Sequence, residues 1–131
     1  ADATYVLPGD DKLRIFRESD FVVSVLPGTP ETEDFVGAAE LAAMKPSSFL
    51  INVARGELVD EDALLQALED DGLAGAALDV FTEEPPTDLD FLSLPNLMVT
   101  PHIGGNAKEA VEAMGCSAVS HLVSFFNKHH K

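Results

Sequence analysis

Three side chains that could bind an organic acid or move a proton each follow an apolar run in the 131-residue sequence. Arg55 comes directly after Phe49–Val53 and Ala54, and His102 comes just after Leu97–Thr100. Glu84 lies in an acidic, proline-containing stretch. Arginine offers a planar fork of donors that can pair with a carboxylate through two hydrogen bonds. Histidine has an ordinary pKa near neutrality, so it can either donate or accept a proton.

Taken one at a time, each of these residues also has a simpler interpretation. A single arginine at the end of a strand usually forms a surface ion pair. An acid in a proline-rich loop is normally exposed to solvent, and a histidine after a proline is commonly part of a turn. The residue types alone therefore leave a catalytic and a structural interpretation open.

The elements that would position these residues alternate between apolar runs and amphipathic helices. This alternation predicts an α/β fold with a parallel sheet of three to four strands. The runs that predict buried strands are Phe21–Leu26, Phe49–Val53, Leu73–Val80 and Leu97–Thr100. Helices are predicted at Glu40–Lys45, from the N-cap Asp60 to Gly72, and from Asn106 to Phe126, with a loop at Glu83–Asp90 and a frayed tail from Asn127.

Several motifs in a fixed order carry a family resemblance. They are Leu50–Gly56, Leu58–Glu61, Gly75–Phe81, Glu83–Pro85 and Thr100–Gly105. Together they resemble the D-isomer-specific 2-hydroxyacid dehydrogenases, in particular the 3-phosphoglycerate dehydrogenase and glyoxylate/hydroxypyruvate reductase branches. The resemblance runs from about residue 19 to about residue 126. It implies the second half of a doubly wound, Rossmann-type sheet with a long C-terminal helix.

The resemblance implies a catalytic role for each of the three residues. Arg55 would bind the carboxylate of a 2-keto acid and polarise its carbonyl group. His102 would protonate the alkoxide that forms when hydride arrives, or accept its proton in the reverse direction. Glu84 would orient the imidazole and stabilise its protonated form.

The resemblance also implies which residues face an NAD or NADP cofactor. Leu26 would lie along the nicotinamide, and Asp79 would bind its carboxamide. The remaining expected contacts are Val53, Ala54, Arg55, His102, Ile103, Gly104 and Gly105. No metal site is expected.

A glycine-rich pyrophosphate loop is missing from the sequence. No G-x-G-x-x-G motif occurs, nor the acidic residue expected about 20 positions later. We therefore expect residues 1–131 to form a partial dinucleotide-binding domain with half a cofactor site and no substrate domain. The isolated chain is expected to be inactive and to need a partner: the missing N-terminal half, another copy or a different subunit.

Charge and composition exclude several other functions. A net charge of −15 argues against nucleic acid or an anionic membrane as a partner. No apolar run approaches the roughly 18 residues of a membrane span. The single cysteine, Cys116, excludes an internal disulfide and is expected to be buried. A soluble protein of the cytoplasm or an organelle matrix fits this composition.

Two functions remain for the chain. The first is a fragment or subunit of an oxidoreductase that transfers hydride between NAD(P)H and a 2-keto or D-2-hydroxy acid. The alternative is a truncated, non-enzymatic paralogue that serves as a structural or interaction subunit of a larger assembly.

Overall fold

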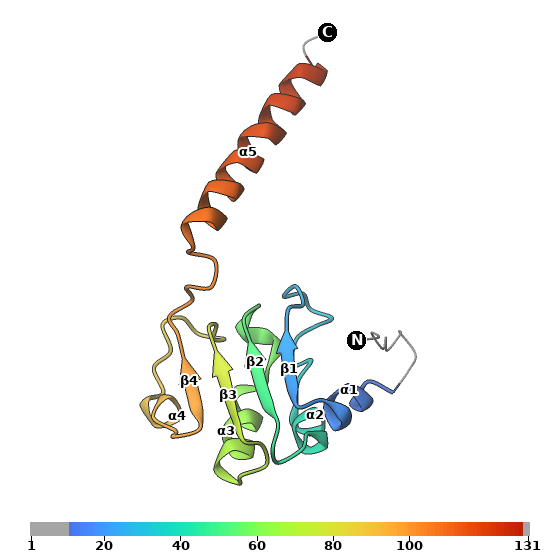
Figure 1. The fold of residues 1–131 in the computed structure, drawn as a ribbon, viewed down its shortest axis with the longest axis vertical. Coiled ribbons are helices and arrows are strands. Elements are labelled where there is room, and N and C mark those ends of the chain that lie inside the picture. The colour runs from blue at the N-terminus through green and yellow to red at the C-terminus, as the bar shows by residue number, and fades with distance from the viewer. Residues whose placement is uncertain (1–10, 130–131) are drawn as a thin grey trace. The chain divides into compact units, whose positions relative to one another are not determined.

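The computed structural model describes residues 11–129, and the chain divides into two compact units, Ala1–Pro101 and His102–Lys131. The first unit holds a four-stranded parallel sheet (Figure 1). Its strands are β1 (Phe21–Ser24), β2 (Phe49–Asn52), β3 (Gly75–Leu78) and β4 (Leu97–Val99). Their order in the sheet is β1-β2-β3-β4, so β1 is an edge strand, and the predicted parallel α/β class is confirmed.

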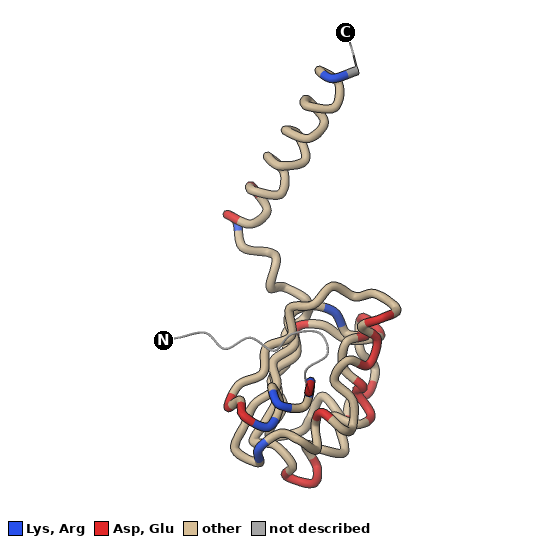
Figure 2. Tube along the Cα trace, turned by 90° about the vertical axis from the view of Figure 1, so that its right-hand side faces the viewer, with Lys and Arg blue, Asp and Glu red and all other residues tan. Residues whose placement is uncertain are grey.

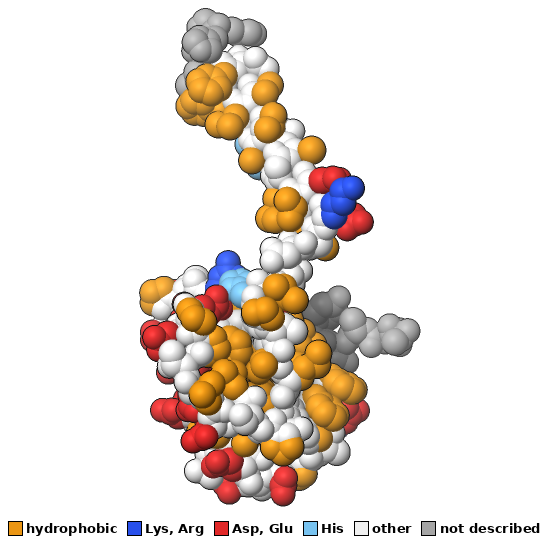
Figure 3. All heavy atoms as spheres, turned by 90° about the vertical axis from the view of Figure 1, so that its left-hand side faces the viewer, with side chains coloured by type: hydrophobic (Ala, Val, Ile, Leu, Met, Phe, Trp, Pro, Cys, Tyr) orange, Lys and Arg blue, Asp and Glu red, His pale blue; other side chains and the backbone are white. Residues whose placement is uncertain are grey.

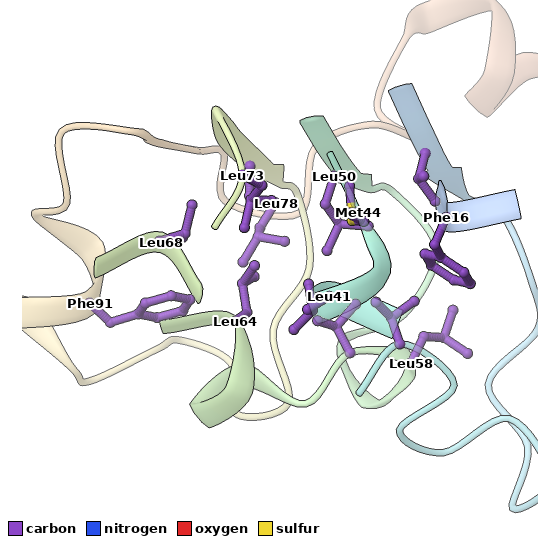
Figure 4. Close-up of a cluster of buried hydrophobic side chains, with 14 of the residues drawn as sticks. Phe16, Leu41, Met44, Leu50, Leu58, Leu64, Leu68, Leu73, Leu78 and Phe91 are labelled. Atoms are coloured by element: carbon purple, nitrogen blue, oxygen red, sulfur yellow. The ribbon is translucent and has the colours of Figure 1, made fainter. Parts of the chain in front are cut away.

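Helices pack against one face of this sheet, with α2 and α3 lying behind the strands in Figure 1. The helices of the first unit are α1 (Leu13–Glu18), α2 (Ala38–Ala43), α3 (Glu61–Glu69) and α4 (Leu89–Leu92), with a short 3₁₀ helix η1 (Gly56–Leu58). Their apolar side chains meet those of the strands in one core (Figure 4). The largest core members with almost no exposed surface are Phe16, Leu41, Leu50, Leu58, Leu64 and Leu73.

The opposite face of the sheet is open, whereas the apolar runs predicted buried strands. Side chains alternate along each strand, so Val22 and Leu50 point into the core while their neighbours point away from it. On the open face Phe21 is 64% exposed, Val23 52% and Met98 66%. An apolar run cannot show whether both faces of a strand are covered, which is why the sequence overstated their burial.

The N-cap of α3 follows the prediction, whereas the short α-helices α1 and α4 and the 3₁₀ helix η1 were not predicted. The Asp60 side chain accepts a hydrogen bond from the N–H of Ala63 at 3.0 Å, as an N-cap should. Helix α4 begins inside the segment predicted as a loop, because the carboxylate of Asp88 caps it through the N–H groups of Asp90 and Phe91. Helix α1, near the start of the described residues, was not predicted.

The second unit consists of a loop and the long helix α5 (Lys108–His129). The helix begins two residues after Asn106 and continues through Asn127, so the predicted capping position and the frayed tail were both wrong. Its charges lie at its two ends, whereas acidic residues are spread over the first unit (Figure 2). Hydrophobic side chains run along α5 (Figure 3). Cys116 is exposed on this helix, which corrects the prediction of a buried cysteine.

None of the helices within residues 11–129 has the combined length and hydropathy that crossing a membrane requires.

Candidate active site

The loop that carries Arg55 is held by Asn52, the last residue of β2, which is only 1% exposed. Its Nδ2 donates to the carbonyl oxygen of Arg55 at 2.7 Å, and its Oδ1 accepts from the N–H of Ala54 at 3.2 Å. The backbone carbonyl of Asn52 accepts from the N–H of Asp79 at 3.0 Å, which joins the ends of β2 and β3. Because both ends of a buried amide are used inside the loop, the backbone at Arg55 is fixed.

The Arg55 side chain is exposed and lies beside the loop that follows β1. Its Nη1 donates to the carbonyl oxygen of Ala54 at 2.7 Å. A Cβ atom at Gly28 would lie 3.1 Å from the Cγ atom of Arg55, so the two loops are in contact. Within the described part of the chain Arg55 forms no ion pair, unlike Arg14 and Arg17. A guanidinium with five donors therefore keeps donors for a ligand.

A cleft of about 520 Å³ opens beside Arg55 at the carboxyl edge of the sheet. It lies between the segments that follow the neighbouring parallel strands β1 and β2. It is lined by Val25, Leu26, Pro27, Gly28, Val53, Ala54 and Arg55. Open parallel sheets bind ligands at this edge. The cleft gathers four of the residues predicted from the sequence, namely Leu26, Val53, Ala54 and Arg55.

Asp79 comes directly after β3 and is 6% exposed. Its Oδ1 accepts a hydrogen bond from the Thr100 hydroxyl at 2.5 Å. Asp79 lines a second hollow of about 180 Å³ together with Val53, which also lines the first cleft. The cleft beside Arg55 and the hollow beside the buried Asp79 carboxylate thus share Val53 at this edge of the sheet.

Glu84 lies on the loop that follows β3 and is exposed, as an acid in such a loop normally is. Its Oε1 accepts a hydrogen bond from the N–H of Phe81 at 3.1 Å. The next N–H group, that of Thr82, donates to Oε1 of Glu61 on α3 at 2.6 Å. Two consecutive backbone donors are therefore bound by two carboxylates.

The loops that carry Arg55 and Glu84 touch through their backbones. A Cβ atom at Gly56 would lie 2.0 Å from the carbonyl carbon of Phe81 and 2.3 Å from the N atom of Thr82. Only a glycine allows this approach. Arg55 and Glu84 thus lie on two loops in direct contact, both on the carboxyl side of neighbouring parallel strands.

His102, Ile103, Gly104 and Gly105 belong to the second unit, and all four are exposed. His102 has a φ of 51°, which places it in the left-handed region that few non-glycine residues adopt. Backbone of this kind is found preferentially at functional sites. Because Arg55 and Glu84 lie in the first unit, the meeting of all three catalytic candidates stays a prediction.

Two residues that hold the site were not singled out from the sequence. Asn52 was named only as part of a strand and of the motif Leu50–Gly56, and Glu61 only as part of a helix and of the motif Leu58–Glu61, with no role of its own for either. An asparagine at the end of an otherwise apolar strand was the available signal for the first. The motif that contains Glu61 does not indicate its contact, because its partner Thr82 lies 21 residues away. Among the described residues no group of three or more His, Cys, Asp or Glu side chains could hold a metal ion.

Known proteins resemble this chain over most of its length. A family model described as the NAD binding domain of D-isomer specific 2-hydroxyacid dehydrogenase matches residues 3–104. The glycerate dehydrogenase of Methylorubrum extorquens is 44% identical over 126 residues, which cover 92% of this chain and 40% of that protein. The glyoxylate reductase of Thermococcus gammatolerans is 44% identical over 113 residues, which cover 86% of this chain and 34% of that protein.

Solved structures share the fold as well. An NADPH-dependent glyoxylate/hydroxypyruvate reductase from Sinorhizobium meliloti, in complex with NADP and malonate, aligns with a TM-score of 0.81 at 38% identity. The alignment covers 87% of this chain and 36% of that one. An NAD-complexed 2-hydroxyacid dehydrogenase from Lactobacillus delbrueckii ssp. bulgaricus aligns with a TM-score of 0.80 at 30% identity, over 97% of this chain and 44% of that one. The chain therefore spans between 34% and 44% of the length of these relatives, and it belongs to the D-isomer specific 2-hydroxyacid dehydrogenase family through its NAD-binding domain.

Proposed function

We propose that this chain supplies the substrate-binding arginine and the nicotinamide side of an NAD(P)-dependent oxidoreductase that interconverts 2-keto and D-2-hydroxy acids. The observation that carries the proposal is Arg55, an exposed arginine without an ion pair among the described residues, held beside a cleft by the buried Asn52. An arginine fixed in this way is suited to a ligand carboxylate, because its planar donors pair with two carboxylate oxygens at once.

In the proposed reaction Arg55 binds the substrate carboxylate and polarises the adjacent carbonyl group. The cofactor, when bound, supplies or accepts the hydride. His102 donates a proton to the oxygen that becomes the hydroxyl group, and takes it back in the oxidation direction. Glu84 orients the imidazole and balances its positive charge. The contact between the loops of Arg55 and Glu84 supports a shared site for these two residues.

The residues at the carboxyl edge fit a nicotinamide ring. Leu26, Val53 and Ala54 offer an apolar cleft wall, and Asp79 is a buried carboxylate that could accept hydrogen bonds from a carboxamide. His102, Ile103, Gly104 and Gly105 are proposed to complete the contacts. Pyrophosphate binding is assigned to another part of the protein, because the sequence has no glycine-rich loop. The chain taken alone is accordingly proposed to be inactive.

A structural role is the second candidate, and the open apolar face of the sheet favours it. An exposed edge strand and apolar face of this kind tend to recruit another chain. The expected partners are the rest of a longer polypeptide, another copy, or a different subunit. A non-enzymatic module would use this face and leave the cleft without a ligand.

A chimera separates the two candidates. Residues 11–129 replace the matching segment of the Thermococcus gammatolerans glyoxylate reductase, with which the chain shares 44% identity. The enzymatic proposal predicts glyoxylate-dependent oxidation of NADH or NADPH by the chimera. A chimera that melts cooperatively, yet neither binds the cofactor in a calorimetric titration nor turns over glyoxylate, would support the structural role instead.

A further inference from the structure

We propose that Glu61, on the first turn of α3, is a positioning residue for Glu84. The expected effect of Glu61 on catalysis rests on the function proposed above, whereas its expected effect on the structure of the loop does not. The inference comes from two carboxylates, those of Glu61 and Glu84, that bind consecutive N–H groups of one loop.

The first step concerns the strength of the Glu61 contact. Its Oε1 accepts from the N–H of Thr82 at 2.6 Å in a solvent-exposed contact, and the charge of the acceptor strengthens such a bond. The partners are 21 residues apart, so the bond joins α3 to the loop after β3. Glu61 directly follows the N-cap Asp60, whose own side-chain bond to Ala63 fixes the first turn of the helix. The acceptor is therefore presented from a rigid element.

The second step concerns what the contact holds in place. The backbone at Phe81 and Thr82 lies against Gly56 on one side, where no Cβ atom would fit. The Glu61 carboxylate binds the same stretch through the N–H of Thr82. A peptide unit held by backbone packing and by a charged acceptor has little freedom to rotate.

The third step links this stretch to Glu84. The N–H of Phe81, immediately before Thr82, donates to Oε1 of Glu84 at 3.1 Å. The peptide unit that Glu61 holds is joined at the Cα atom of Phe81 to the peptide unit whose N–H binds Glu84, so release of the first would loosen the dihedral angles that aim the second and, with it, the Glu84 carboxylate. Glu61 thereby sets the direction of an acid that it does not touch, and it does so through the loop backbone.

Hydrogen exchange measured by NMR on the 131-residue chain tests the structural part. Glu61→Ala removes the acceptor, whereas Glu61→Gln keeps an oxygen at the same place. Asp62→Ala is the matched control, because it removes a first-turn charge from the same helix. We expect Glu61→Ala to accelerate exchange of both the Thr82 and the Phe81 amides at least about tenfold, with the other two variants within about twofold of the parent. Faster exchange at Thr82 alone, with Phe81 unchanged, would overturn the proposal.

Kinetics of the chimera test the consequence for catalysis. Glu61→Ala is expected to lower kcat about tenfold while KM for glyoxylate stays within about twofold, because Glu84 acts on proton transfer and Arg55 on substrate binding. Glu61→Gln should restore kcat. Equal loss in Glu61→Gln and Glu61→Ala would overturn the positioning role. If the parent chimera has no activity, the proposed function fails, and the exchange measurement still decides the role of Glu61.

Discussion

Gly56 gives the sharpest test of the contact between the two loops. In Gly56→Ala the new methyl carbon would lie 2.0 Å from the carbonyl carbon of Phe81 and 2.2 Å from its oxygen. Real contacts of this kind are almost never below 3.0 Å, so backbone must move by at least the difference of about 1 Å. The φ of Gly56 lies outside the left-handed range, so the substitution tests crowding rather than backbone strain.

Crowding against backbone cannot be relieved by rotating a side chain, which places the cost at the upper end of the range for overpacking. We expect Gly56→Ala to lower the free energy of unfolding by about 3 kcal/mol. Urea unfolding of the 131-residue chain, followed by circular dichroism, measures the change. Gly37→Ala is the matched control, because a Cβ atom there would meet its nearest neighbours at an ordinary 3.6 Å. Loss of an N-cap glycine should cost no more than about 1 kcal/mol. Equal stability of the two variants would refute the close approach.

Three further predictions concern other parts of the first unit. Asn52→Ala should lower the free energy of unfolding by about 2 kcal/mol, since it leaves the buried polar groups of the loop unsatisfied. Urea unfolding measures this change, and a loss below about 0.5 kcal/mol would contradict the role of Asn52 in holding the Arg55 loop. Burial raises the pKa of Glu40, but the hydrogen bonds and charge of Lys12 and the N–H of Gly37 outweigh it and leave that pKa below its ordinary 4.5. The stability that ionised Glu40 contributes is present above pH 4.5 and is lost as the pH falls through the lowered pKa. The free energies of unfolding of Glu40→Gln and of the parent protein should therefore become equal in acid-unfolding experiments below the lowered pKa. A difference that stays constant with pH would contradict the assignment. The 131-residue chain should self-associate at micromolar concentration in sedimentation experiments. Val23→Lys, on the open face, should weaken this association. A stable parent monomer would show that the exposed face does not drive self-association.

The sequence predicted the fold class well because a parallel α/β sheet leaves a strong periodic signal. Four apolar runs became four parallel strands, and the Asp60 cap began α3 where expected. The same signal could not reveal the open face, since an apolar run in the sequence does not show which of its side chains are buried. Helix α4 was hidden by the prolines and acids around it, although the cap Asp88 and the buried Phe91 were both present.

The candidate site was predicted in part. The cleft gathers the residues named around Arg55, and Asp79 lies on an adjoining hollow. What the sequence could not show is how these residues are held. The bonds of Asn52 to its own loop and of Glu61 to a loop 21 residues away depend on tertiary structure. Such contacts produce no periodicity or spacing in the sequence from which they could be predicted.

The most direct test of the account is the substitution Arg55→Lys in the glyoxylate reductase chimera. Lysine keeps the positive charge but loses the planar pair of donors, so kcat/KM for glyoxylate should fall by about 100-fold or more. Arg17→Lys is the control, because that arginine is engaged in an ion pair with Asp11, and its activity should stay within about twofold of the parent. A folded Arg55→Lys chimera with kcat/KM equal to that of Arg17→Lys would contradict the assignment of Arg55 to the substrate carboxylate.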